Sequence, residues 1–185
     1  MQLSDGVGPY KYDEYSITIN SFPTNLSPMS YLKEFAMSPN SAVNNKIFNI
    51  ANKFKKRISG RLALGDIWDI DIMGPDNGSI VLVKTSPYLV SSNGFDIQAD
   101  AWFDIQTIEC EKYGTHPECG GREFGFESLP TGIKFYTRGV SRSYMQIHRS
   151  GTPIQNQSWK SMLSGIAEEL TQRGAIINNK TVNIS

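Results

Sequence analysis

The chain has 185 residues, an apolar fraction of 39% and a formal net charge of zero, because 18 lysines and arginines balance 18 aspartates and glutamates. Such a chain is long enough to bury a core, and its balanced charge argues against a general nucleic-acid binder or a surface held on anionic lipid by charge alone. No apolar run approaches the ~20 residues that span a bilayer, and the first residues lack the features of a cleavable signal peptide.

The N-terminal third predicts one strand and two helices. Residues 1–25 mix glycine, proline and tyrosine and are expected to pack loosely, apart from an edge strand over Tyr15–Ile19. Ser27-Pro28 is typical of a helix start, and this helix should end before Pro39. A second helix is predicted over residues 43–58, where apolar side chains recur every three or four positions. These side chains are Val43, Ile47, Ile50, Phe54 and Ile58.

Beyond this second helix the hydrophobic period changes to two, which predicts strands. We expect strands at Ile67–Met73, Ile80–Val83, Phe95–Ile108, Glu123–Glu127, Ile133–Val140 and Thr181–Ile184. A last helix, over about residues 156–173, carries a helical stripe of Trp159, Met162, Leu163, Ile166, Ala167 and Leu170. The chain is therefore predicted to be one α+β domain over residues 1–185. Its twisted, mainly antiparallel sheet should pack against two or three amphipathic helices.

Two cysteines, Cys110 and Cys119, bracket a loop that contains glycine and proline. We expect a disulfide between them, which would close a strand-to-strand loop and place the protein in a secreted or periplasmic compartment. Two free thiols, as in a cytosolic protein, are the first alternative. A zinc site is the second, because Cys110, His116 and Cys119 are three potential ligands within one loop. We expect no cofactor.

The segment from Arg142 to Ser150 carries the densest cluster of groups that could act on a phosphate or acyl group. Arg142 and Arg149 could hold an anion, and His148 could move a proton. Its partner would be a carboxylate from the polar face of the 95–108 strand, namely Asp100 or Asp104. Alternating aspartates on a solvated sheet face are nevertheless expected without any catalytic role, and a polar loop before the last helix is the simpler reading of this segment.

Some fragments resemble the colicin M family of lipid II-cleaving phosphodiesterase toxins. They are Gly78–Leu82, Ser92–Gly94, Gly139–Tyr144, Glu169–Thr171 and Gly174–Ala175. The resemblance implies a secreted bacterial toxin whose chemistry rests on an Asp-x-Tyr-Asp cluster followed closely by His-Arg. Here Asp100 and Asp104 flank a tryptophan instead of a tyrosine, and the His148-Arg149 dipeptide lies far along the chain.

Two main hypotheses follow. The first is a non-catalytic, extracytoplasmic binding domain that recognises a protein or small-molecule partner through a sheet face or groove. Its expected ligand-binding residues are Trp102, Tyr136, Arg138 and Tyr144, with Trp68 as a further aromatic anchor. The second is a toxin-like hydrolase at the cell envelope that uses His148, Arg149, Arg142 and an aspartate near Asp100. An enzyme should bring His148 within reach of a carboxylate in a pocket, whereas a binding domain should scatter these groups.

Overall fold

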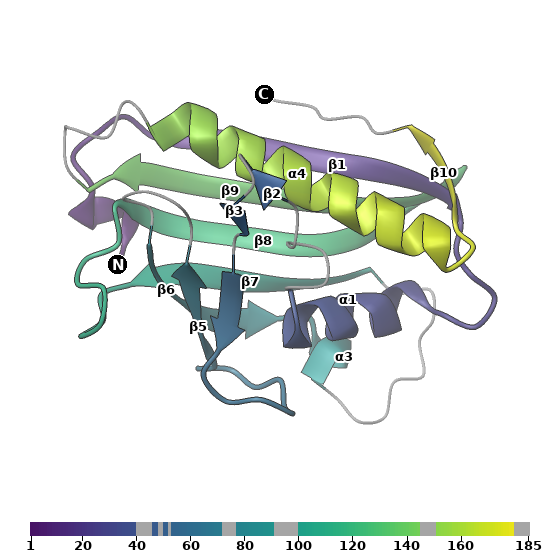
Figure 1. The fold of residues 1–185 in the computed structure, drawn as a ribbon, viewed down its shortest axis with the longest axis horizontal. Helices are drawn as coiled ribbons and strands as arrows, with labels where there is room; N and C mark the ends of the chain where they lie inside the picture. Colours follow the sequence, from purple (N-terminus) through teal and green to yellow (C-terminus); the bar gives the residue numbers. More distant parts are fainter. Residues whose placement is uncertain are drawn as a thin grey trace.

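The structure, a computed structural model, describes residues 1–39, 46–47, 50–51, 53–71, 77–90, 100–144 and 151–179. Its centre is an eight-stranded antiparallel sheet in the order β10-β1-β9-β8-β7-β6-β5-β4 (Figure 1). The strands of this sheet are β1 (Lys11–Ser21), β4 (Lys53–Lys56), β5 (Ile67–Asp71), β6 (Gly78–Thr85), β7 (Ala101–Ile108), β8 (Glu118–Leu129), β9 (Gly132–Ser143) and β10 (Ile176–Asn179).

Two helices, α1 (Pro28–Met37) and α4 (Gly151–Gln172), lie on the same face of this sheet (Figure 1). We call that face the inner face and the opposite one the outer face. The shorter elements are η1 (Leu3–Asp5), β2 (Lys46–Ile47), β3 (Ile50–Ala51) and α3 (Pro87–Val90). In the part of the chain that the structure describes, no helix has the length and hydropathy needed to cross a membrane.

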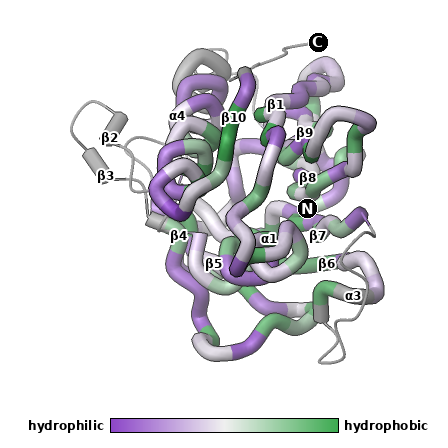
Figure 2. Tube along the Cα trace, turned by 90° about the vertical axis from the view of Figure 1, so that its right-hand side faces the viewer, coloured by the Kyte–Doolittle hydropathy of each residue, from purple (hydrophilic) through white to green (hydrophobic). Residues whose placement is uncertain are grey.

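Helix α1 begins as the sequence predicts, and α4 packs as predicted but begins at Gly151, before the predicted start near Asn156. The side chain of Ser27 caps α1 by accepting a hydrogen bond from the Ser30 N–H at 3.1 Å, and Pro28 occupies the first helical position. On α4 the stripe from Met162 to Leu170 is buried, and Gly174 follows the helix with φ +99°. The hydropathy of α4 changes repeatedly along its turns, as expected of a helix with one face in the core (Figure 2).

The core lies between the inner face and the two helices. On β8 and β9, Phe124 and Phe135 point inward and meet the ring of Phe35 from α1, with centroids 5.5 and 6.0 Å apart. On β7, Ala101, Phe103 and Ile105 are buried as the alternation predicts. The chain is thus α+β, a large antiparallel sheet with two helices.

The structure corrects two other parts of the sequence reading, and the predicted C-terminal strand stays untested. The predicted helix over residues 43–58 is wrong where the chain is described, because Phe54 lies in β4 and pairs with Ile70 of β5. The strand around Tyr15–Ile19 is not at an edge, since β1 pairs with β9 on one side and β10 on the other. The described C-terminal strand is Ile176–Asn179, and the predicted Thr181–Ile184 lies outside the described residues, as do residues 91–99 and 72–76.

Candidate functional site

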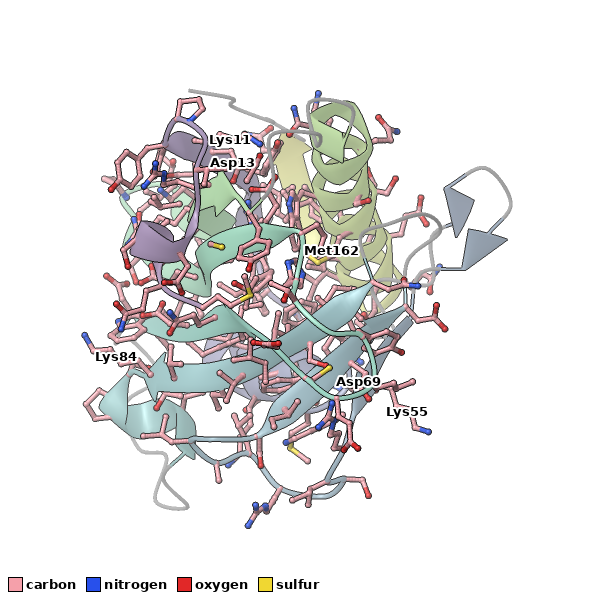
Figure 3. All side chains as sticks on the ribbon, turned by 90° about the vertical axis from the view of Figure 1, so that its left-hand side faces the viewer. Lys11, Asp13, Lys55, Asp69, Lys84 and Met162 are labelled. Atoms are coloured by element: carbon pink, nitrogen blue, oxygen red, sulfur yellow. The ribbon has the colours of Figure 1, made fainter. Side chains whose placement is uncertain are left out.

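The inner face of the sheet changes from apolar to polar along its strands. On β8 every second residue points inward, and these positions run from Phe126 and Phe124 through Arg122 and Gly120 to Glu118. On β1 the same change runs from Ile19, Ile17 and Tyr15 to Asp13 and Lys11. Figure 3 labels Lys11 and Asp13 together at this end of β1. The interior therefore has an apolar end and a polar end.

Arg122 is the central charge of the polar end. Its side chain is only 9% exposed, and its guanidinium forms an ion pair with Asp13 and donates to Thr137 Oγ1 at 3.2 Å. The guanidinium also lies 4.1 Å from the centroid of the Trp159 ring, a cation–π contact with α4. Burial lowers the pKa of Arg122. Gly139 leaves room for this group, because a Cβ there would lie 2.8 Å from the Arg122 NH2 atom.

Tyr15 joins the polar end to the N-terminal half of α4. Its hydroxyl donates to Asn156 Oδ1 at 2.9 Å. Burial, and secondarily the charge of Asp13, raises the pKa of Tyr15 to about 12, so the phenol stays neutral at physiological pH. The hydrogen bond and the Arg122–Trp159 contact hold this half of α4 over the sheet.

His116 and Glu118 form the far wall of the polar end. His116 is 9% exposed, and burial lowers its pKa to about 4, so the ring is neutral at pH 7. Its Nδ1 accepts a hydrogen bond from the Glu118 N–H at 3.1 Å. Gly78 lies against the ring, since a Cβ there would come within 2.2 Å of His116 Cδ2. Glu118 Oε1 accepts from Lys11 Nζ at 3.0 Å and from Ser143 Oγ at 3.3 Å.

Two adjoining cavities lie between this face and the helices. The polar one measures about 70 Å³ and is lined by His116, Glu118, Arg122 and Trp159 among others. The apolar one measures about 20 Å³ and is lined by Phe124, Phe103 and Met162 among others. Figure 3 labels Met162, which comes from α4. Both cavities border Ile80 and Ile105, so the two lie next to one another.

Side chains that line these cavities carry buried polar atoms without hydrogen-bond partners in the described structure. These atoms are the indole Nε1 of Trp159, Oε2 of Glu118 and, beside the apolar cavity, the indole Nε1 of Trp68. A buried donor or acceptor without a partner costs roughly 1–3 kcal/mol, and a ligand or a water that supplied the partner would recover part of that cost. A polar ligand group or a water molecule in the interior could supply the hydrogen-bond partners that these atoms lack.

The outer face brings together four of the residues predicted from the sequence, Asp104, Trp102, Tyr136 and Arg138. Asp104 lies directly opposite Glu123 across β7 and β8. Glu123 Oε1 accepts from the hydroxyl of Tyr136 at 2.7 Å and is 2.6 Å from Arg138 NH2. Burial, then the charge of Glu123, raises the pKa of Asp104 to about 6. Trp102 is on the same face, with the Lys84 ammonium 5.2 Å from its ring centroid.

A groove of about 440 Å³ runs over this part of the outer face, bordered by Asp104, Glu123, Arg138 and the N-terminal Gln2 and Leu3. It is larger than the interior cavities. Its Arg138 and Glu123 are already paired with one another, however, whereas the interior keeps polar atoms without partners. We therefore place the candidate site in the interior.

Of the other predicted catalytic residues, the structure describes Arg142 and Asp100, and each has a different partner. Arg142 donates from Nε to the Gly8 carbonyl at 2.7 Å and stacks on Tyr10, so it anchors the N-terminal segment. Asp100 accepts from the Ser128 N–H at 2.8 Å. The Tyr144 N–H donates to the Pro117 carbonyl at 2.9 Å. His148 and Arg149 lie outside the described residues, and the distance between His148 and an aspartate stays a prediction.

The predicted disulfide is not formed, because Cys110 and Cys119 are both free thiols. Ser79 Oγ lies 3.1 Å from the sulfur of Cys110, whereas Cys119 is fully buried on β8. The argument for an oxidising compartment that rested on this disulfide therefore no longer holds. Within the described residues, no three histidine, cysteine, aspartate or glutamate side chains come together as a metal site.

The sequence reasoning missed the interior residues Lys11, Asp13, Glu118 and Arg122, and it treated Trp159 as a core residue only. The sequence does contain one indication that Arg122 and Glu118 lie in the interior. The inward phenylalanines of β8 imply, by strand alternation, that Arg122 and Glu118 also point inward. A charged residue at a predicted core position indicates a buried ion pair or a site.

No protein-family model and no curated protein matches this chain, so the resemblance to the colicin M family gains no support. Solved structures do match. Norcoclaurine synthase from Thalictrum flavum has a TM-score of 0.57 and 9% identity, covering 92% of this chain and 91% of its own. The ginseng (Panax ginseng) major latex-like protein 151 has a TM-score of 0.54 and 12% identity, with 88% and 99% covered. A hypothetical protein of Helicobacter pylori has a TM-score of 0.55 and 6% identity, with 89% of each chain covered. Such low identities show a shared fold alone.

Proposed function

We propose that the protein is a small-molecule-binding domain whose site is the interior between the inner face and α4. The observation that carries this proposal is that two side chains lining one cavity, Trp159 and Glu118, each carry a buried polar atom without a partner, Nε1 and Oε2. An adjoining apolar cavity lined by phenylalanines and Met162 would take the body of the ligand.

The fold likeness supports the same location. Norcoclaurine synthase from Thalictrum flavum has been solved with dopamine and hydroxybenzaldehyde bound, so at least one protein with this fold takes small aromatic molecules. The cavities described here are smaller than the ~150 Å³ that holds a benzene ring. Entry of a ring would therefore require movement of the side chains that close them, above all the flexible Met162.

The experiment uses toluene as an apolar probe and follows the methyl groups of Met162, Ile80 and Ile105 by NMR. Toluene should shift these methyl signals in a saturable way. Ile105→Phe, which adds volume where the two cavities meet, should weaken binding at least fivefold. Val83→Phe is the matched control, because Val83 is 42% exposed on the outer side and should leave binding unchanged.

Saturable shifts confined to outer-face groups, with the interior methyl signals unmoved, would refute the interior site. The wild-type titration gives this answer even if the enlarged side chain at position 105 destabilises the fold.

A further inference from the structure

The polar cavity offers one hydrogen-bond donor and one acceptor that need partners. The donor is the indole N–H of Trp159, and the acceptor is Oε2 of Glu118, whose other oxygen is held by Lys11 and Ser143. The cavity of about 70 Å³ is large enough for roughly two water molecules, at ~30 Å³ each, or for one small polar group. A guest that fits this end must therefore both accept and donate hydrogen bonds.

The charges around the cavity decide what charge the guest carries. Glu118 is paired with Lys11, and Arg122 is paired with Asp13. His116 is buried and neutral. The four charged side chains therefore cancel, and a carboxylate or an ammonium brought into the cavity would find no unpaired counter-charge among the side chains that line it. The N-terminal ammonium donates to the Thr107 carbonyl and is not one of the lining groups. Desolvating an ion without such a partner costs several kcal/mol, far more than a neutral group.

We propose that the interior site selects small ligands with an apolar body and an uncharged head that both donates and accepts hydrogen bonds, such as an alcohol hydroxyl or a primary amide. The head lies in the polar cavity, accepting from Trp159 Nε1 and donating toward Glu118 Oε2, directly or through one water. The body lies toward the ring of Phe124, which is 6.0 Å from Trp159, and toward Met162. This assignment rests on the proposed function of the interior.

The test compares four probes that share one ring: toluene, benzyl alcohol, benzoate and benzylamine at pH 7. Benzyl alcohol should bind about fivefold to tenfold more tightly than toluene, the ratio that one net hydrogen bond of ~1–1.5 kcal/mol gives. Benzoate and benzylamine should bind more weakly than benzyl alcohol. Their dissociation constants are measured by NMR titration of the interior methyl signals.

A variant then locates the head. Trp159→Phe keeps a ring but removes the N–H, so it should reduce the affinity for benzyl alcohol to that for toluene. Trp102→Phe makes the same chemical change on the outer face and is the matched control, with no expected effect on either probe.

Each outcome decides between the two proposals. If benzyl alcohol binds no better than toluene, or if a charged probe binds best, the neutral head is wrong while the interior site stands. If none of the probes, toluene included, shifts the interior methyl signals, the proposed function fails as well. The wild-type comparison requires no variant to fold.

Discussion

The burial of His116 makes the stability of this protein depend on pH. Burial lowers the pKa of His116 to about 4, against ~6.5 for an exposed histidine. Between these two values the unfolded chain binds a proton that the folded chain does not. The contribution is therefore fully present above pH ~6.5 and is lost as the pH falls toward 4. The arithmetic for one such group gives a loss of about 2 kcal/mol between pH 7 and pH 5.

Asp104 acts in the opposite direction over the same range. Burial and the neighbouring Glu123 raise its pKa to about 6, so the folded state holds a proton that the unfolded chain has released. Its contribution grows as the pH falls below 6. The measurement is therefore made in an Asp104→Asn background, which removes this term. The other charges near His116 are Glu118 and the N-terminal ammonium, and both are kept.

The assay is urea unfolding at pH 7 and pH 5, with and without His116→Asn. The asparagine Oδ1 can still accept the Glu118 N–H but does not titrate in this range. Removing the ring lowers the free energy of unfolding at both pH values, so the readout is the difference between them. We expect the pH-dependent loss to shrink by about 2 kcal/mol in the variant. An equal loss with and without His116 would refute the buried neutral ring.

Three further predictions concern packing, the ion pair and the thiols. Leu163→Ala on α4 should lower the free energy of unfolding by roughly 2–5 kcal/mol in urea titrations, because Leu163 is 1% exposed, and a loss below ~1 kcal/mol would place this face outside the core. Asp13→Ala should cost roughly 3 kcal/mol because it leaves Arg122 buried without a counter-charge, and adding Arg122→Met should restore most of the loss if the pairing is correct. Native protein should be alkylated by iodoacetamide at pH 7.5 faster at Cys110 than at Cys119, as judged by peptide mass mapping. At Cys110 burial alone would raise the pKa of the thiol, but hydrogen bonds from Ser79 and from the backbone of Tyr113 and Lys112 lower it overall. At Cys119 burial raises the pKa. Equal native rates would contradict these environments.

The fold class followed from the sequence because local signals agree with the tertiary structure in most elements. Ser27-Pro28 started α1, and the 3.6-residue stripe of α4 lies in the core. The region around Phe54 failed for a physical reason. Its apolar spacing fits a helix, but Lys53–Lys56 holds a single apolar residue, Phe54, which specifies neither period, and pairing with β5 decided the outcome. Such a short segment is compatible with both periods, and only the neighbouring strand distinguishes them.

The inner position of β1, between β10 and β9, could not be predicted from its own residues. Tyr15, Ile17 and Ile19 alternate with polar residues, a pattern that suits an edge strand and an inner strand of a sheet with one solvated face equally well. The strand lies inside the sheet because β9 and β10, more than 100 residues away along the chain, pair with its two sides. No local pattern records pairing at that distance.

The candidate site shows the same division between local and distant information. That Arg122 points into the core follows from its two-residue spacing to Phe124, so the sequence alone marks a charge that must be neutralised. Its counter-ion, Asp13, is 109 residues away along the chain. Trp159, which packs on the guanidinium, belongs to α4, and the alternation of the strands does not predict where that helix lies on the sheet. Charge balance at the polar end is thus a property of the assembled sheet and helix. The proposed preference for a neutral ligand head rests on that balance, so it depends on contacts that form only once β1, β8 and α4 have come together.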